Sequence, residues 1–288
     1  MKRVRGMYFS GTKTTETVVE RIADKLYAAL KEADAADVMR ADSIDFTPPG
    51  ARTERYAFDG ADIVVFGVPV IAGRVPNVLL GFLDTLEGGG AKAVPIVLYG
   101  NRNFDDALIE LRDILQRRSF HCITAGAFIG EHSFSRILAA GRPDEADLEI
   151  ANQLAKATAA KLLQEGSRAG DEAPPVEVDG QTPLRPYYKP RDRQGNFINI
   201  LKVKPKLDAE KCDGCGICAR VCPMGSIHEE ALGEVQGICI KCCACEKLCP
   251  QGAMYFDDPG YLYHKEELEL GFADRKEPKI FTGKELDS

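Results

Sequence analysis

The sequence predicts an α/β protein in which a doubly wound parallel sheet is followed by a small, cysteine-rich α+β domain. Two observations lead to this prediction. Short apolar runs of strand length alternate with helical runs from the N-terminus to about residue 163. Nine of the ten cysteines then lie between Cys212 and Cys249. Apolar strands with helices between them are typical of a parallel sheet that is buried on both faces.

Five strands and four helices are expected in the first half. The strands cover residues 3–10, a weakly marked segment near Val38, and residues 61–70, 91–100 and 120–130. The helices cover residues 14–30, 77–86, 105–118 and about 144–163. The first helix has one apolar face at helical spacing, made by Val18, Val19, Ile22, Leu26 and Leu30. Five such strands suit the order 2-1-3-4-5, in which a ligand binds at the carboxyl ends of the strands.

The loop after the first strand, in "GMYFSGTKTTE", is rich in hydroxyl groups. It differs from the nucleotide-binding loop G-x-x-x-x-G-K-[ST], because Thr12 stands in the lysine position and Lys13 comes one residue later. Backbone N–H groups at a helix N-terminus attract an anion, and hydroxyls add donors without adding charge. The loop therefore favours a single terminal phosphate over a triphosphate with magnesium. Hydroxyls that merely cap a helix are an equally good interpretation of this loop alone.

Composition excludes several classes of partner. The chain has 288 residues, a formal net charge of −7 and a pI near 5.3, whereas nucleic-acid binding needs a basic face. No apolar run approaches the roughly 20 residues of a transmembrane helix. The basic N-terminus "MKRVRGMYF" has too short an apolar stretch for a signal peptide. We therefore expect a cytoplasmic protein with no nucleic-acid partner and no membrane insertion.

The cysteines form two similar runs, "CDGCGICARVCP" and "CIKCCACEKLCP". Both follow C-x2-C-x2-C-x3-C-P, the bacterial ferredoxin pattern, in which the fourth cysteine binds the other cluster. Each ligand of the second run lies 27 residues after its counterpart, which indicates an internal duplication. The pattern assigns one 4Fe–4S cluster to Cys212, Cys215, Cys218 and Cys249. It assigns a second 4Fe–4S cluster to Cys239, Cys242, Cys245 and Cys222.

A pair of zinc sites is the alternative for these cysteines. Zinc is usually held by two separated C-x2-C pairs or by mixed Cys and His ligands, and two triplets with remote Cys-Pro ligands do not fit that pattern. Cys243 stands where the first run has Gly216, and we expect a small structural role, with cluster repair or ligand exchange as the alternative. Cys122 lies in an apolar run and is expected to be a buried, inert thiol.

Three loops of the first half resemble those of flavodoxins. "YFSGTKTTETV" resembles the phosphate loop [ST]-x-T-G-x-T, and "FGVPVIAGRVP" and "YGNRNFDDAL" resemble the two loops around the flavin ring. With the two cysteine runs, nearly the whole chain resembles the fused flavodoxin–ferredoxin family. The resemblance implies a flavodoxin-like fold and bound FMN. It places around the phosphate Ser10, Gly11, Thr12, Lys13, Thr14 and Thr15. It places around the ring Pro69, Val70, Ile71, Ala72, Gly73, Arg74, Tyr99, Gly100, Asn101, Arg102, Phe104 and Asp105.

Several positions depart from the family pattern or allow two interpretations. Lys13 replaces the usual loop glycine, and Ile71 stands where relatives commonly have Tyr. Phe104 is then expected to cover a ring face, with helix packing as the alternative. Arg74 and Arg102 can stabilise a reduced, anionic flavin or can be surface residues without a role. For His132 we expect a hydrogen-bonded structural role, and proton donation is the alternative.

The expected domains are a flavodoxin-like FMN-binding domain (1–166), a Gly- and Pro-rich linker (167–203), a ferredoxin domain with two 4Fe–4S clusters (204–257) and a C-terminal extension (258–288). We expect the extension to pack back across the other parts.

The expected function is electron transfer between the two clusters and FMN, with redox proteins as partners; a homo-oligomer is left open. No G-x-G-x-x-G motif follows a strand, so no nicotinamide site is expected. One alternative is an FMN-dependent reductase of a small acceptor such as a quinone or a disulfide. Another is a binding module in which the clusters sense redox state.

Overall fold

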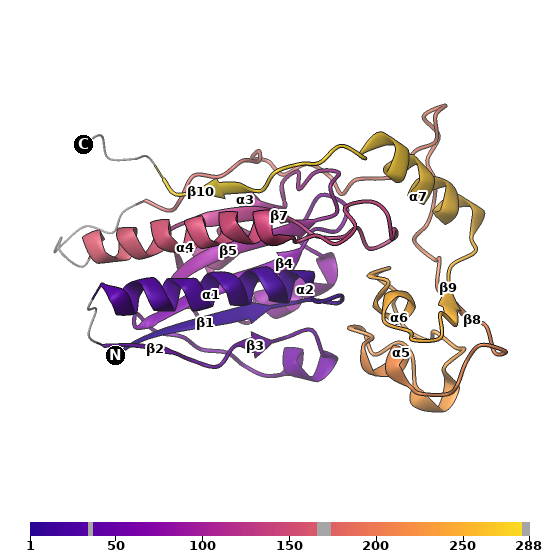
Figure 1. Ribbon diagram of the computed structural model, residues 1–288, viewed down its shortest axis with the longest axis horizontal. Helices are drawn as coiled ribbons and strands as arrows, with labels where there is room; N and C mark the ends of the chain where they lie inside the picture. Colours follow the sequence, from indigo (N-terminus) through magenta and orange to yellow (C-terminus); the bar gives the residue numbers. More distant parts are fainter. Residues whose placement is uncertain (34–36, 166–173, 284–288) are drawn as a thin grey trace.

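The computed structural model describes residues 1–33, 37–165 and 174–283 (Figure 1). A mostly parallel sheet runs through the larger part of the molecule, with helices on both faces. A small cysteine-rich domain lies beyond one end of this sheet, and helix α7 (Pro259–Gly271) lies beside it (Figure 1). No helix in these described ranges is both long enough and apolar enough to cross a bilayer.

The sheet has the predicted strand order. Its main strands are β1 (Lys2–Tyr8), β2 (Val38–Arg40), β4 (Asp62–Pro69), β5 (Lys92–Tyr99) and β7 (Ala125–Ile129). They are arranged β2-β1-β4-β5-β7 and pair in parallel, which confirms the order 2-1-3-4-5 and the flavodoxin-like fold class. Seven of the eight residues of β4 are buried, as a strand with helices on both faces requires.

Two expected strands are interrupted in the structure. The second is short and is followed by β3 (Ile44–Asp45), which also pairs with β1. The fifth is divided into β6 (His121–Cys122) and β7, both paired with β5. Thr124 lies in the break, and its hydroxyl is bonded to that of Thr158 at 2.7 Å. Cys122 is fully buried, as expected for an inert thiol.

The helices divide between the two faces of the sheet and form two apolar cores. Helix α1 (Thr14–Glu32) and helix α4 (Glu145–Glu165) cover one face, and their apolar residues share a core that includes Ile22 and Leu154. Helix α2 (Asn77–Leu83) and helix α3 (Ala107–Arg117) cover the other face, in a core that includes Leu79 and Leu111. A 3-10 turn, η1 (Pro49–Thr53), follows β3.

The small domain is α+β, as predicted. Strands β8 (Lys206–Leu207) and β9 (Met254–Tyr255) pair in antiparallel fashion. Between them lie three short helical turns: α5 (Ile217–Arg220), η2 (Glu229–Ala231) and α6 (Ala244–Lys247). The predicted boundary between the first domain and the linker, at residues 166 and 167, lies outside the described residues, as does the end of the extension from residue 284.

The C-terminal extension packs back across both parts, as expected. Tyr261 of α7 contacts the small domain, with its hydroxyl 3.4 Å from the Cys243 sulfur. Strand β10 (Lys279–Phe281) then joins the large sheet as an antiparallel edge strand beside β7. Between them, Asn101 donates from Nδ2 to the carbonyls of Phe272 (2.6 Å) and Asp274 (2.9 Å). The extension is therefore part of the main fold.

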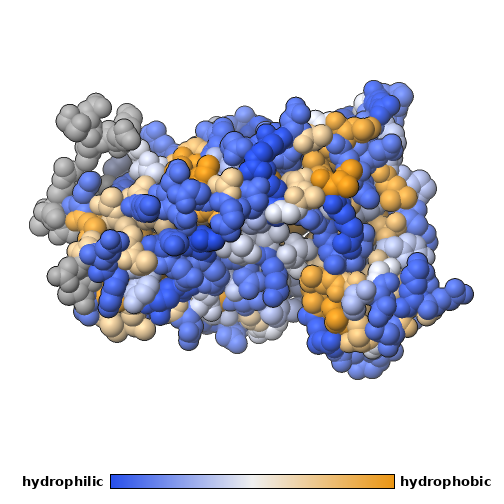
Figure 2. Space-filling model, in the orientation of Figure 1, coloured by the Kyte–Doolittle hydropathy of each residue, from blue (hydrophilic) through white to orange (hydrophobic). Residues whose placement is uncertain are grey.

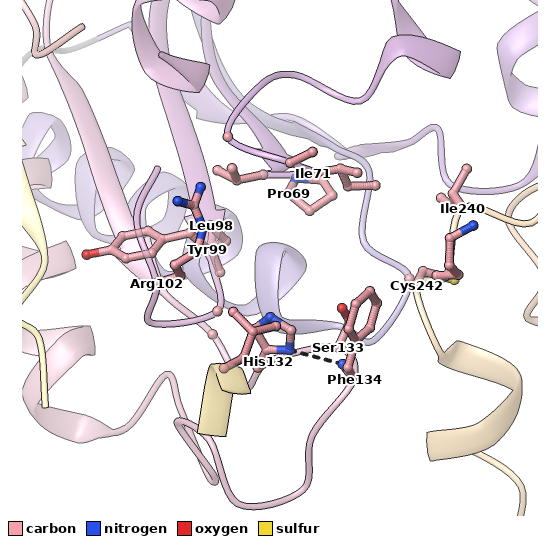
Figure 3. A pocket seen from close by; sticks show the side chains of 18 of the residues that line it. Pro69, Ile71, Leu98, Tyr99, Arg102, His132, Ser133, Phe134, Ile240 and Cys242 are labelled. Carbon is pink, nitrogen blue, oxygen red and sulfur yellow. Dashed lines mark hydrogen bonds between the residues drawn. The ribbon is translucent and has the colours of Figure 1, made fainter. Parts of the chain in front are cut away.

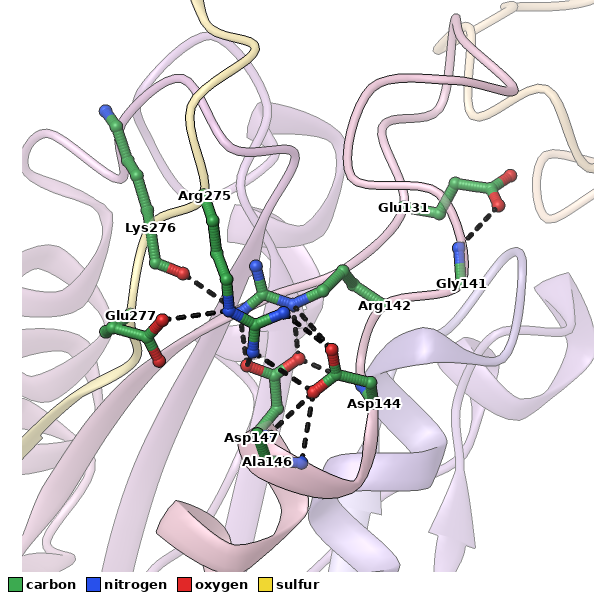
Figure 4. Close-up of polar contacts among 9 residues, drawn as sticks. All are labelled: Glu131, Gly141, Arg142, Asp144, Ala146, Asp147, Arg275, Lys276 and Glu277. Carbon is green, nitrogen blue, oxygen red and sulfur yellow. Dashed lines mark hydrogen bonds and ion pairs between the residues drawn. The ribbon is translucent and has the colours of Figure 1, made fainter.

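A network of ion pairs fastens the extension to the start of α4 (Figure 4). Arg142 is buried and forms a bidentate pair with the fully buried Asp147. The same guanidinium donates to the carbonyl of Lys276 at 2.9 Å. Arg275 pairs with Asp144 at 2.6 Å, and its guanidinium holds the pKa of that carboxyl well below its usual range. The Arg275–Asp144 salt bridge joins two segments that are 131 residues apart in the sequence.

Candidate flavin and cluster sites

A cavity of about 260 Å³ lies at the carboxyl ends of β1, β4 and β5. It is lined by residues of all three loops that resemble flavodoxin loops. Figure 3 shows Pro69 and Ile71 on one side, His132 opposite them, Tyr99 and Arg102 at one end and Cys242 at the other. The predicted residues that line this cavity are Gly11, Thr12, Thr14, Thr15, Pro69, Val70, Ile71, Ala72, Gly73, Tyr99, Gly100 and Arg102.

The phosphate end of the cavity is the N-terminus of α1. Thr12, Thr14 and Thr15 line it, so hydroxyls and free backbone N–H groups surround the same space. Lys13 precedes the helix with φ 66°, the left-handed conformation in which glycine is the usual residue. Lys13 therefore has the backbone conformation that a glycine would usually adopt at this position of the loop. These donors suit an anion such as the phosphate of FMN.

The ring loops pack closely against their neighbours. A Cβ atom on Gly73 would lie 2.3 Å from the carboxylate of Asp105, so only glycine fits between the two ring loops. A Cβ atom on Gly100 would lie 2.4 Å from the His132 ring. The loop after β7 is thus pressed against the second ring loop, and together they narrow the cavity.

Six predicted residues do not line the cavity. Ser10 is buried, and its hydroxyl accepts from the backbone N–H of Glu16 at 3.1 Å. Lys13 is exposed. Asn101 holds the extension, and Asp105 pairs with Arg102. Ser10, Asn101 and Asp105 therefore hold the loops through bonds away from the cavity, and the Lys13 side chain faces solvent.

Two of the six require a correction. Phe104 was expected to cover a ring face, but it is buried in the core, with its ring 5.5 Å from that of Tyr99. Helix packing, the alternative, describes its position. Arg74 was expected near a reduced flavin, but its guanidinium forms two bonds of 2.6 and 2.7 Å to Glu110. Of the two arginines, only Arg102 lines the cavity, and it lies 4.4 Å over the Tyr188 ring.

His132 lines the cavity and is also held by a hydrogen bond. Its Nδ1 accepts from the backbone N–H of Phe134 at 3.1 Å, so the ring proton belongs on Nε2. Burial and the nearby Lys247 lower the pKa of His132 to about 3. The imidazole is therefore neutral near pH 7, which fits a fixed hydrogen-bond donor better than a proton source.

Sequence reasoning missed the residues that cover the cavity from distant parts of the chain. Tyr188 and Pro190 come from the linker, Ile200 and Leu201 from the segment before the small domain, and His264 and Leu268 from α7. Figure 2 shows apolar side chains on both sides of the junction between the two domains. No local motif marks these residues, because their role depends on contacts between segments far apart in the sequence.

The two predicted cysteine sets come together in space. Cys222, Cys239, Cys242 and Cys245 line one small cavity, here called the proximal site. Cys212, Cys215, Cys218 and Cys249 line another, here called the distal site. The fourth cysteine of each run thus lies in the site formed by the other run.

The donor sets fit 4Fe–4S clusters. Four thiols around a closed space suit a cubane, in which each cysteine binds a different iron. Within the described residues, no three His, Cys, Asp or Glu side chains converge closely enough to hold a single metal ion. Cys243, the ninth thiol of the region, also lines the proximal cavity. It is 1% exposed, and its sulfur lies 3.4 Å from the Tyr261 hydroxyl and 3.4 Å from the carbonyl of Lys241, so it already has partners within the protein.

The proximal site directly adjoins the flavin cavity. Cys242 lines both spaces. A Cβ atom on Gly11 in the phosphate loop would lie 3.3 Å from Cys242 Cβ and 3.5 Å from its sulfur. Glycine at this position therefore leaves room for Cys242, a predicted cluster ligand, close to the phosphate loop. The distal site does not share a lining residue with the flavin cavity.

Comparisons with known proteins identify one part of the chain directly. Residues 205–228 match the family model of the 4Fe-4S binding domain, which indicates a 4Fe–4S cluster at the first cysteine run. No curated protein sequence matches the chain.

The similar solved structures include a flavodoxin from the domain Archaea (16% identity, TM-score 0.37), which covers 57% of this chain and 99% of its own. A flavodoxin of Streptococcus pneumoniae TIGR4 (18%, TM-score 0.36) covers 55% and 99%, and an azoreductase from Bacillus anthracis (15%, TM-score 0.36) covers 54% and 99%. The chain combines a flavodoxin-like sheet with a 4Fe–4S binding domain. The match of residues 205–228 to the 4Fe-4S binding domain indicates iron–sulfur chemistry in the second part of the chain.

Proposed function

We propose that this protein transfers electrons between two 4Fe–4S clusters and one FMN held by the same chain. The observation that carries the proposal is the position of Cys242, which lines both the proximal site and the flavin cavity. When bound, FMN exchanges one or two electrons and each cluster exchanges one. The protein supplies position, hydrogen bonds and exclusion of side reactions.

We infer the direction of electron flow from the exposure of the cysteines at the two sites. Each site has one buried cysteine, Cys218 or Cys245, but only the distal site has an exposed one, Cys215. A redox protein can therefore approach the distal site most closely. Residues of the linker and α7, among them Tyr188 and His264, cover the flavin cavity on the side away from the sheet. Electrons would enter at the distal site and reach the flavin through the proximal site.

The test is rapid mixing of the anaerobic holoprotein with a reduced ferredoxin-type donor, with cluster and flavin absorbance followed separately. We expect the clusters to be reduced first and the flavin afterwards, at a rate that does not depend on protein concentration. A flavin that stays oxidised while the clusters stay reduced would contradict the proposal. So would a flavin rate proportional to protein concentration, because the transfer would then be intermolecular.

A second candidate is reduction of a small acceptor, such as a quinone or a disulfide, at the flavin. It is favoured by the rim of the cavity, where Leu201 and Tyr188 are 75% and 38% exposed. Steady turnover of such an acceptor by the reduced holoprotein, with saturation at rising acceptor concentration, would support this candidate. A slow, unsaturable reaction would leave protein partners as the acceptors.

A further inference from the structure

The two cysteine runs differ at one position where the backbone is left-handed in both runs. The 27-residue repeat aligns Lys241 of the second run with Gly214 of the first. Both residues have a left-handed backbone, with φ 56° at Lys241 and 75° at Gly214. Glycine adopts this conformation without strain, whereas a lysine does so at a conformational penalty. The second run therefore keeps a lysine where the backbone favours glycine, which calls for a functional reason.

The Lys241 side chain is buried and has only neutral partners. The residue is 9% exposed, and its Nζ donates to the carbonyls of Cys239 (3.0 Å) and Leu201 (3.2 Å). Within the described residues it forms no ion pair, unlike Lys247 of the neighbouring helix α6, which pairs with Glu131. A buried ammonium group is unfavourable unless an anion lies close to it. Within the described residues no carboxylate pairs with Lys241, so a bound anionic group is the candidate for that partner.

Two anionic groups would lie beside this side chain. Lys241 lines the flavin cavity, and its ammonium is bonded to the carbonyl of Cys239, a ligand of the proximal site. A cubane with four thiolate ligands has a net negative charge, and one added electron makes it more negative. A reduced flavin can also become an anion. The side chain therefore lies between the two places where negative charge develops during electron transfer.

We propose that Lys241 is a shared counter-ion of the proximal cluster and the flavin, and that it raises the reduction potential of both. This inference rests on the proposed function. Burial of the proximal site alone would oppose the addition of negative charge, and the ammonium offsets that effect. At the distal site Gly214 takes the place of this lysine, and the neighbouring Asp213 accepts from the backbone N–H of Cys215 at 3.1 Å. Arg220 donates to the carbonyl of Cys215 at 2.8 Å, but its guanidinium is exposed and paired with Glu229, unlike the buried ammonium of Lys241. Lys241 thus favours reduction of the proximal cluster and the flavin over reduction of the distal cluster.

The test is a redox titration of anaerobic holoprotein, followed by EPR and absorbance, with the Lys241→Gln and Lys241→Arg variants. Glutamine keeps a donor for the two carbonyls but removes the charge, and arginine keeps the charge. In Lys241→Gln we expect the ratio of reduced to oxidised proximal cluster at a fixed potential to fall roughly tenfold, or about 59 mV for a one-electron couple.

The flavin potential should fall in the same direction, the distal potential should stay constant, and Lys241→Arg should resemble the wild type.

Lys204→Gln is the matched control, because Lys204 also donates to a carbonyl, that of Val235 at 2.6 Å, but is exposed. Unchanged potentials in a Lys241→Gln protein with full iron and FMN content would overturn the proposal. If the glutamine variant loses the proximal cluster and the arginine variant keeps it, the need for a charge supports the proposal.

If both variants lose that cluster, the role of Lys241 is steric and the proposal is overturned. Failure of the proposed function would look different. In that case the wild-type protein itself would lack one of the cofactors or would not transfer electrons from its clusters to its flavin.

Discussion

At the residue scale, strained backbone positions coincide with the candidate sites. Among the described residues, eight other than glycine have a positive φ, and six of these lie in the phosphate loop, the two ring loops or the second cysteine run. They are Lys13, Ala72, Asn101, Asp105, Lys241 and Cys243. Such conformations persist only where the surrounding structure enforces them, and they gather at ligand sites. The loops that would hold FMN and the proximal cluster are therefore shaped in advance.

The phosphate loop gives the first prediction. Changing both Thr12 and Thr14 to Ala should weaken FMN binding by several kcal/mol, because each hydrogen bond to a charged group is worth about 1.5–3 kcal/mol. Titration of the apoprotein with FMN, followed by quenching of flavin fluorescence, measures the effect. Thr17→Ala is the control, since Thr17 bonds to the carbonyl of Lys13 and does not line the cavity. Riboflavin that binds the wild type as tightly as FMN would contradict a phosphate site here.

Crossed ligation gives the second prediction. Cys222 belongs to the first run but lies in the proximal site, so Cys222→Ala should damage the cluster held by Cys239, Cys242 and Cys245. The distal cluster should keep its four irons, and flavin reduction by a ferredoxin-type donor should become slower. EPR and iron analysis of the anaerobic variant measure the first two effects, and rapid mixing measures the third. An unchanged flavin rate after proven loss of the proximal cluster would remove that cluster from the path.

At the scale of elements, short segments fasten the small domain to the flavin loops. Lys247 at the end of α6 donates to the carbonyls of His132 (2.7 Å) and Ser135 (2.8 Å) and pairs with Glu131. Arg52 of η1 donates to the carbonyl of Pro223, the residue after Cys222. Both cations hold segments that carry proximal cysteines, so they set the position of that site relative to the flavin cavity.

Lys247→Met should loosen this attachment. The Lys247 side chain is 9% exposed, and its loss would leave Glu131 and two carbonyls without their donor. We expect the unfolding free energy to fall by about 2 kcal/mol. Denaturant unfolding of the holoprotein measures it, with hydrogen exchange to detect selective loss of protection in residues 131–135. Lys265→Met is the control, because its pair with Glu269 is long, at 3.9 Å, and contributes about 0.5 kcal/mol or less. Equal effects of the two variants would argue against a special role for Lys247.

At the scale of the whole molecule, four parts of the chain meet at one cavity. The sheet loops form its floor, and the linker with its segment around Ile200, the small domain and α7 supply the remaining walls. Strand β10 returns to the sheet beyond α7 and locks this arrangement by pairing with β7. The candidate flavin cavity therefore depends on segments from both parts of the chain, including the linker and α7.

Cofactor content is the prediction at this scale. Protein purified without oxygen should contain about eight irons and one FMN per chain, because each cysteine set suits one cubane and the three loops surround one flavin-sized site. Iron, acid-labile sulfide and flavin analysis measure these quantities. Two zinc ions per chain without labile sulfide would contradict the cluster assignment.

The sequence by itself determined the features that depend on local spacing. Strand length, helical periodicity and parallel pairing predicted the sheet order, because short-range patterns and connection rules leave few topologies open. The cysteine spacing predicted which four thiols would meet, because an internal duplication implies crossed partners. Both results follow from patterns that are contiguous in the chain.

Only the tertiary structure decided how the two halves adjoin. The contact of Gly11 with Cys242, the burial of Phe104 beside Tyr99 and the isolated ammonium of Lys241 depend on segments that are distant in sequence. Side chains of one type can be buried, paired or exposed, depending on what packs against them. The environment of such a side chain depends on which distant segments pack against it, so no local sequence pattern predicts it.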